Sequence, residues 1–235
     1  MATYQEIAKM IDHSLLNPTL TDADIIAGCQ LADEYNVASV CVRPSDVKLA
    51  KSILINSEVL VTTVIGFPHG TTTTLAKLAE AQEAIDNGCA ELDLVINIGK
   101  LKSGELGYVA KDLGSVIAVA HAQQVKVKVI FENTYLTKEE IKEATFICNK
   151  VNADWVKTST GYAGGGATDE DLKIMRTYAL PHIQVKAAGG VRTLERALEV
   201  RKLGCSRFGA TATKSILEEL KTGLSSSIEN SGKAY

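Results

Sequence analysis

Short apolar runs alternate along the chain with longer segments in which apolar residues recur at helical spacing. Most of the runs are nearly continuous in hydrophobicity, which predicts strands buried on both faces, as in a parallel sheet. The predicted strands occupy residues 10–14, 38–42, 59–66, 91–96, 126–132, 154–159, 183–189 and 206–211.

Four of the intervening segments carry helix start or stop signals. Residues 21–36 offer Thr21 or Asp22 as an N-cap, and residues 71–88 carry an apolar face and end in Asn-Gly. Residues 137–152 begin with a Thr-x-x-Glu capping box, and residues 193–204 end in glycine. The chain therefore follows a repeated strand–helix order.

Eight strands in this order predict a single TIM (β/α)8 barrel with a short N-terminal helix. Strand starts lie roughly 21 to 35 residues apart, a spacing that suits successive strand–helix units. An open doubly wound sheet is the alternative, but the first strand lacks the Gly-rich turn that such a fold normally carries. We expect one domain over residues 1–235, with a polar and mobile tail at 225–235.

Composition narrows the class of protein. The net charge is -3 with both signs interspersed, so the chain shows neither a nucleic-acid nor a membrane-binding footprint. No apolar run is long enough to span a bilayer, and the first residues lack the apolar core of a signal peptide. The five cysteines are odd in number and form no CxxC pair, which favours buried thiols over disulfides or zinc. We expect a cytoplasmic protein.

Two lysines stand at matching strand ends of the predicted barrel, where catalytic groups collect. Lys157 and Lys186 each follow a valine and precede small residues and glycine. Burial and mutual repulsion both lower a lysine pKa, and a neutral amine is a nucleophile. The alternative is that each lysine forms an ion pair with a carboxylate such as Asp93.

Several motifs resemble those of the deoxyribose-phosphate aldolase family, which are class I, Schiff-base-forming aldolases. They are "IDHSLLNPTLT", "VIGFPHG", "ELDLVIN", "VKVIFENTYLT", "DWVKTSTGY", "VKAAGGVRT" and "SRFGAT", and they span nearly the whole chain in family order. The resemblance implies reversible cleavage of 2-deoxy-D-ribose 5-phosphate to D-glyceraldehyde 3-phosphate and acetaldehyde, in deoxyribonucleoside catabolism. It implies no metal and no cofactor.

By position, the resemblance places the Schiff-base lysine at Lys157, the second active-site lysine at Lys186 and the acid–base carboxylate at Asp93. Asp12, at the end of the first strand, would either buttress this network or serve a helix start or core ion pair. Thr158 is a further candidate for support. Strand alternation is taken to turn Trp155 away from Lys157, as barrel packing.

The loops after strands 7 and 8 are candidates for a phosphate site, as in other barrel enzymes. Arg192 would contact phosphate or cap the strand-7 loop. For each glycine an ordinary tight turn is the alternative. The candidate binding residues are Gly161, Gly189, Gly190, Val191, Gly209, Ala210 and Thr211.

This sequence departs from the family pattern at two positions next to these candidate phosphate-binding residues. Tyr162 stands where some members have a phosphate-binding lysine, and Ala212 lacks the hydroxyl that many members have. The preference for phosphorylated over free deoxyribose therefore stays open. Some relatives end in a tyrosine proposed to reach the site; Tyr235 would do so here or lie in a disordered tail.

Two rival functions remain. One is another phosphosugar-acting barrel enzyme, an isomerase or synthase with electrostatic lysines, and the other is a non-catalytic phosphometabolite-binding protein. The expected partner is a small phosphosugar, with no nucleic acid and no membrane. Barrels commonly associate, so we expect a homo-oligomer, a dimer or a tetramer.

Overall fold

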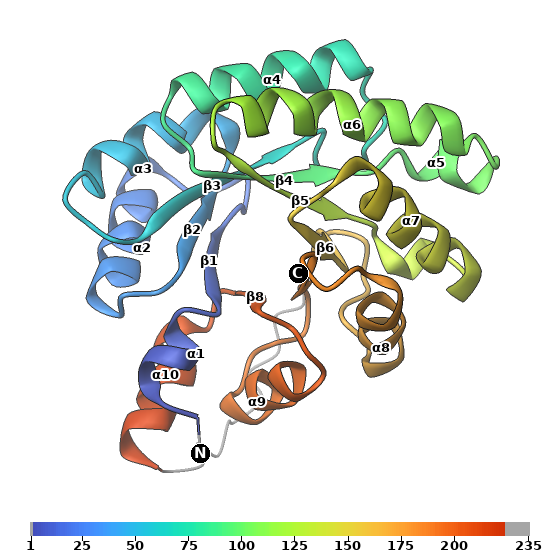
Figure 1. Ribbon diagram of the computed structural model, residues 1–235. Helices are drawn as coiled ribbons and strands as arrows, with labels where there is room; N and C mark the ends of the chain where they lie inside the picture. The colour runs from blue at the N-terminus through green and yellow to red at the C-terminus, as the bar shows by residue number, and fades with distance from the viewer. Residues whose placement is uncertain (1, 224–235) are drawn as a thin grey trace.

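Eight parallel strands close into a barrel in chain order, with β8 pairing back onto β1 (Figure 1). This computed structural model describes residues 2–223, so the predictions for the tail and for Tyr235 lie outside the described residues. The TIM barrel prediction is confirmed. The strands are β1 (Ile11–Leu15), β2 (Ser39–Val42), β3 (Leu60–Ile65), β4 (Glu91–Val95), β5 (Lys126–Ile130), β6 (Trp155–Lys157), β7 (Gln184–Ala187) and β8 (Arg207–Ala210).

Helices surround the barrel, and the short N-terminal helix is present (Figure 1). Short 3-10 turns follow β2 and β5, at Pro44–Asp46 and Asn133–Tyr135. The helices in the described part of the chain are α1 (Tyr4–Ala8), α2 (Asp22–Glu34), α3 (Val47–Ile53), α4 (Thr74–Asp86), α5 (Ile98–Lys102), α6 (Leu106–Ala122), α7 (Lys138–Val151), α8 (Asp169–Tyr178), α9 (Leu194–Lys202) and α10 (Thr213–Thr222).

Threonine caps fix where most of these helices begin. Thr137 and Glu140 form the capping box expected for α7, and Thr21, one of the two N-cap candidates for α2, forms a second box with Asp24. Thr73 caps α4, so the threonines before it lie outside the helix. The first turns of α2, α4 and α7 are therefore tied to the loops that precede them, at the carboxyl end of the barrel.

Seven of the eight strands are shorter than predicted, whereas β1 keeps its length and begins one residue later. The clearest case is β6, predicted over 154–159, which ends at Lys157. Beyond it, Thr158 Oγ1 donates to the carbonyl of Ala188 at 3.0 Å and accepts from the amide of Ala188 at 3.0 Å. This pair of bonds joins the ends of β6 and β7.

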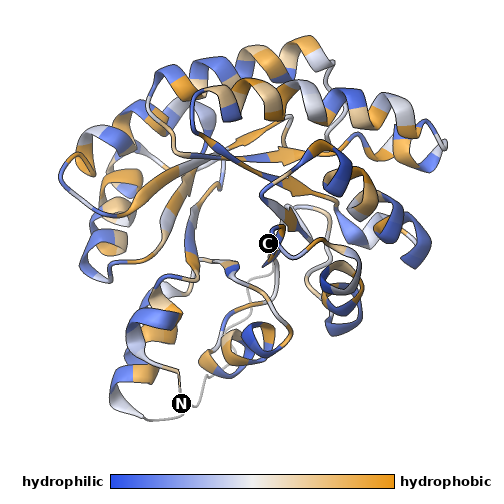
Figure 2. Ribbon diagram, in the orientation of Figure 1, coloured by the Kyte–Doolittle hydropathy of each residue, from blue (hydrophilic) through white to orange (hydrophobic). Residues whose placement is uncertain are grey.

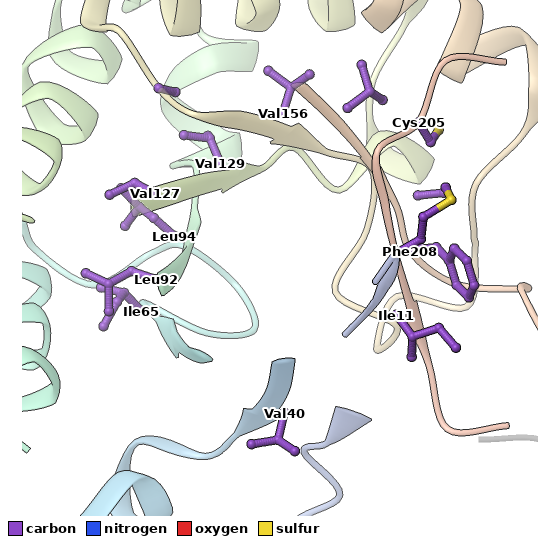
Figure 3. Packing of buried hydrophobic residues seen from close by; sticks show 14 of the residues in the cluster. Ile11, Val40, Ile65, Leu92, Leu94, Val127, Val129, Val156, Cys205 and Phe208 are labelled. Atoms are coloured by element: carbon purple, nitrogen blue, oxygen red, sulfur yellow. The ribbon is translucent and has the colours of Figure 1, made fainter. Parts of the chain in front are cut away.

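The apolar core lies between the barrel and its helices. Figure 2 shows the strands largely in hydrophobic colours, and Figure 3 shows their apolar side chains packed together. The residues involved include Ile11, Val40, Leu92, Leu94, Val127, Val129, Val156 and Phe208, all fully buried. Because strand residues alternate between faces, the opposite face fills the barrel interior.

The barrel interior is polar, although such interiors are usually filled by branched apolar residues. Asp12, Glu91, Asp93, Lys128 and Lys186 are all buried to 2% exposure or less. The strands are thus buried on both faces, as the hydrophobic runs predicted, but the inner face carries charge. No helix within residues 2–223 is both long and apolar enough to cross a membrane.

Candidate active site

Lys157 and Lys186 lie side by side on β6 and β7. They are register partners across the two strands, and their side chains are only 5% and 1% exposed. Each Nζ atom lies 2.7 Å from the same oxygen, Oδ2 of Asp93 on β4. The three side chains that the resemblance singled out are therefore in direct contact.

The ion pair that was the alternative role for these lysines is present in the geometry, but the pKa values of the two lysines are shifted in opposite directions. Burial lowers the pKa of Lys157, the Lys186 ammonium lowers it further, and together they outweigh the attraction of Asp93. Burial also acts to lower the pKa of Lys186, but the carboxylates of Asp12 and Asp93 outweigh it, so this pKa is raised. A lowered pKa at Lys157 beside a charged Lys186 favours the neutral form of the Lys157 amine, which is the form that acts as a nucleophile.

Asp12 supports Lys186 from β1. Its Oδ2 lies 2.5 Å from Lys186 Nζ as an ion pair, off hydrogen-bond geometry. Its Oδ1 accepts hydrogen bonds from Ser39 at 2.8 Å and from Arg207. Burial alone would raise the pKa of Asp12, but the surrounding cations hold it well below its usual value. Of the two roles expected for Asp12, the geometry fits the buttress within an ion-pair network.

Sequence reasoning missed a second group of charges beside this one. Lys128 Nζ on β5 lies 2.5 Å from Glu91 Oε2 and 3.0 Å from Asp93 Oδ1. Arg207 on β8 lies 2.9 Å from Glu91 Oε1 and also bonds to Asp12. Strand alternation was the available signal, because Glu91 and Asp93 are two residues apart and must share a face.

The prediction that Trp155 faces away from Lys157 is wrong. Residues two apart on a strand share a face, so Trp155 lies on the interior face below Lys157. Its ring lies 5.5 Å from Lys128 Nζ and 5.5 Å from the Arg207 guanidinium carbon. Its indole nitrogen donates to Ser206 Oγ at 2.9 Å. The indole therefore contributes to the charged interior and not to the apolar core.

The candidate phosphate residues gather at the ends of β6, β7 and β8. Gly189 and Gly190 adopt left-handed φ values of +81° and +87°, and Gly161 adopts +90°. Val191 is buried, whereas Thr211 is exposed. Gly209 and Ala210 lie within β8, where a Cβ on Gly209 would stand 4.0 Å from Lys186 Cε.

Helix α10 begins beside these loops without a side-chain cap at Ala212. By contrast, α9 begins with Thr193, whose side chain accepts from the amide of Arg196 at 3.2 Å. Uncapped amides at a helix start favour an anion. Arg192 is exposed on the loop between β7 and α9.

The loop after β6 packs backbone to backbone on the loop after β7. A Cβ on Gly166 would meet the Gly189 carbonyl oxygen at 2.7 Å, and a Cβ on Gly189 would meet Gly166 Cα at 2.8 Å. The amide of Ala167 donates to that same carbonyl at 3.1 Å. Only glycine permits this approach, a feature that the sequence analysis did not anticipate.

Glu132 holds the loop after β6 from the other side. It is a buried non-glycine residue with φ of +58°, and its carboxylate accepts from the amide of Thr160 at 3.2 Å and from the Thr160 hydroxyl. A left-handed conformation in a buried acidic residue is strained and is maintained only by its surroundings. The loop that carries Gly161 is therefore fixed on both sides.

An apolar cavity of about 310 Å³ opens at the same end of the barrel. Tyr162 lines it, packs edge-on against Phe67 at 5.3 Å, and donates its hydroxyl to the carbonyl of Leu16 at 2.8 Å. The other lining residues are Pro18, Arg43, Pro44, Val64, Pro68 and Glu80. Leu16, Val64 and Phe67 also cluster around Cys41, whose buried thiol has a pKa raised to about 11.

Within the described residues, no three His, Cys, Asp or Glu side chains form a group that could hold a metal ion. All five cysteines are buried free thiols. The polar groups at the barrel mouth include amines, carboxylates, hydroxyls and backbone amides. Such groups can form an imine, move protons and bind an anion.

Comparisons with known proteins point to a single family of aldolases. The model of the family described as DeoC/LacD family aldolase matches residues 6–218. A protein named deoxyribose-phosphate aldolase from Rhodopirellula baltica is 51% identical over 226 residues, covering 95% of this chain and 94% of that protein. One of the same name from Thermococcus gammatolerans is 48% identical, covering 91% of this chain and 96% of that protein. The solved structure of an Aeropyrum pernix deoxyribose phosphate aldolase, described as a unique tetramer, is 26% identical with a TM-score of 0.88 and covers 95% of this chain and 94% of that chain.

Proposed function

The chain belongs to the DeoC/LacD aldolase family, and from this premise we propose that Lys157 is the Schiff-base lysine of its reaction. The protein is a lyase that cleaves 2-deoxy-D-ribose 5-phosphate reversibly to D-glyceraldehyde 3-phosphate and acetaldehyde, in deoxyribonucleoside catabolism. The observation that carries the residue assignment is the contact of Lys157 and Lys186 with one Asp93 oxygen, combined with their opposite pKa shifts.

The reaction begins with attack by neutral Lys157 on the aldehyde carbon C1 of the substrate. The carbinolamine that forms loses water and gives an iminium ion. When the bond between C2 and C3 breaks, its electron pair moves into the iminium and forms an enamine, while C3 becomes the aldehyde carbon of glyceraldehyde 3-phosphate. Protonation of the enamine at C2 and hydrolysis then release acetaldehyde and free Lys157.

Proton transfer in this scheme falls to Asp93 and Lys186. Lys186 remains protonated and can donate to a leaving hydroxyl, and Asp93 joins Lys186 to Lys157 through one oxygen. The proton taken from the C3 hydroxyl during cleavage has a short path along these contacts. Asp12 holds Lys186 in place, and Thr158 fixes the end of β6 against β7.

Borohydride added together with acetaldehyde is expected to leave an N-ethyl group on Lys157 and on no other interior lysine. Imine formation needs a neutral amine, and Lys186 and Lys128 are held charged by carboxylates. Peptide mass mapping locates the adduct, and acetaldehyde or borohydride alone serves as the control. An isomerase or synthase would turn over a phosphosugar without gaining this mass, and a binding protein would show neither turnover nor adduct. A folded sample without any adduct would contradict the assignment.

We further propose that the phosphate binds where the loops after β7 and β8 meet the start of α10. Backbone amides around Gly189, Gly190 and Val191 would contribute, together with Gly209, Ala210, Thr211 and Gly161. Support comes from the absence of a side-chain cap on α10 and from the small residues around it. Tyr162 supplies no cation here, since it is bound to Leu16, and Arg192 is a candidate for a supplementary contact.

Thr211→Asp is expected to raise the KM for 2-deoxyribose 5-phosphate by about tenfold or more. A carboxylate at the start of α10 would repel the phosphate and compete for the same amides. The kcat/KM for unphosphorylated 2-deoxyribose should stay unchanged. In the uncharged control Thr211→Asn, the KM for the phosphorylated substrate and the kcat/KM for the unphosphorylated one should both stay unchanged. An equal loss on both substrates would place the phosphate elsewhere.

We also propose that the chain forms a single barrel domain that assembles into a homo-oligomer and works in the cytoplasm. A tetrameric relative and five buried free thiols support this. Light scattering of the purified protein would measure the assembly.

A further inference from the structure

Seven charged side chains fill the barrel interior and contact one another. Lys157 is the most exposed of their lysines, and Arg207 contacts the ring of Trp155. We call these side chains the interior charge network; its members are Asp12, Glu91, Asp93, Lys128, Lys157, Lys186 and Arg207.

Four bases and three carboxylates make up the network. With every group ionised, the interior carries one excess positive charge, and with one base neutral it carries none. An uncompensated charge away from water is strongly unfavourable, so a buried group that can release its proton does so. Arg207 cannot take this part, because a guanidinium keeps its proton in proteins.

The contacts identify which lysine releases the proton. Lys128 is within 3.7 Å of oxygens from all three carboxylates, and its pKa is raised because these carboxylates outweigh its burial. Lys186 contacts two carboxylates, Asp12 and Asp93. Within the described residues, Asp93 is the only carboxylate that pairs with Lys157, and Lys157 shares its Oδ2 atom with Lys186. Lys157 is therefore the lysine with the weakest hold on its proton.

Other titratable groups near Lys157 do not alter this balance. Cys41 on β2 faces it, but the thiol stays neutral because burial raises its pKa to about 11. The neighbouring strand β3 contributes Thr62 and Val64, and neither side chain carries a charge. The other buried carboxylates of the described chain, Asp46, Asp112 and Glu132, are bound by Arg43, Lys77 and Thr160.

We propose that the interior charge network, through its single excess positive charge, keeps Lys157 neutral, and that Lys128, Glu91 and Arg207 are positioning residues that set the pH range of imine formation. Lys186 alone then does not account for the activation of Lys157. The inference rests on the proposed function of Lys157 and extends it to other residues of the same network.

The test measures how acetaldehyde imine trapping and kcat/KM depend on pH. On the acidic side of the pH profile, the acid limb, both quantities rise as Lys157 loses its proton. Lys128→Met removes one positive charge, so the network no longer has an excess positive charge when Lys157 is protonated. The acid limb should therefore move up by about one to two pH units. Glu91→Gln removes one negative charge and moves the acid limb down. The double variant restores the balance, and its acid limb returns toward that of the unaltered protein.

Lys77→Met is the matched control for burial and stability. Lys77 is equally buried and pairs with Asp112 at 2.6 Å, but it lies outside the barrel between α4 and α6. Its loss should lower the melting temperature without moving the acid limb.

An acid limb that stays in place in both network variants, or moves the same way in both, overturns the inference. If Lys128→Met does not fold, the isosteric Glu91→Gln decides alone: a downward shift supports the inference and no shift overturns it. If the unaltered protein traps no imine at all, the proposed function fails instead. The two failures are therefore distinct.

Discussion

Lys157→Leu is expected to abolish aldol cleavage, with a loss in kcat on the order of 10⁴-fold or more, as for other enzymes stripped of a covalent nucleophile. The fold should remain intact. Leucine fills a similar space, and Asp93 keeps Lys128 and Lys186 as ionic partners. Removal of an amine whose burial already lowers its pKa leaves no charge unpaired, so the melting temperature should hold or rise.

Lys157→Arg separates the charge of this side chain from its nucleophilicity. It keeps a cation beside Asp93 but cannot release a proton. It should therefore be as inactive as the leucine variant and form no adduct with acetaldehyde and borohydride. Measured formation of D-glyceraldehyde 3-phosphate by either variant would show that another residue forms the imine.

Asp93→Asn is expected to lower both stability and activity. Asparagine has the same shape but no charge, and it would leave three lysines without their common carboxylate. Breaking a buried ion pair by removing one partner costs about 3–5 kcal/mol of unfolding free energy. Loss of the proton path should lower kcat by about 10²- to 10⁴-fold. Denaturant unfolding and steady-state kinetics measure the two effects.

The pH dependence of this stability loss has a defined sign. In the unaltered protein Asp93 has a depressed pKa, so it stabilises the fold above the ordinary carboxylate pKa of about 4, and this contribution disappears as the pH falls through its lower folded-state value. Loss of the carboxylate also lowers the raised pKa of Lys186. The deficit of Asp93→Asn should therefore narrow as the pH rises and the lysines lose their protons.

Asp112→Asn is the control for buried ion pairs in general. Asp112 binds Lys77 at 2.6 Å and Thr74 at 2.7 Å outside the barrel, so its loss should also destabilise the fold. Cleavage by the folded fraction should be unaffected. A comparable loss of kcat in both variants would mean that Asp93 acts only by holding the structure together.

The strand–helix order and the main catalytic candidates could be predicted from the sequence. The apolar runs located all eight strands because burial between barrel and helices requires one apolar face. Lys157 and Lys186 were found because each stands at a strand end before small residues. Strand ends were placed less well; β6, for example, ends at Lys157, and the Thr158 side chain then bonds to the backbone of Ala188.

Alternation along β4 places Glu91 on the same face as Asp93, but the contacts among the inward-facing charges could not be predicted without the register between strands. Glu91, Lys128 and Arg207 come from three strands, and only the closed sheet brings them together. Trp155 was misplaced by an error in applying the alternation rule, not by a missing signal. The close approach of Gly166 and Gly189 depends on two loops meeting, which no local pattern encodes.

A barrel lined with ion pairs responds to heat differently from one lined with branched hydrocarbons. The hydration of ions becomes less favourable as temperature rises, so the penalty for keeping Lys128, Glu91 and their neighbours dry shrinks on warming. The side chains that surround the reactive amine therefore destabilise the native state less at elevated temperature. In this scaffold the residues around the reactive amine also affect how stability changes with temperature, so substitutions among them are expected to act on both properties.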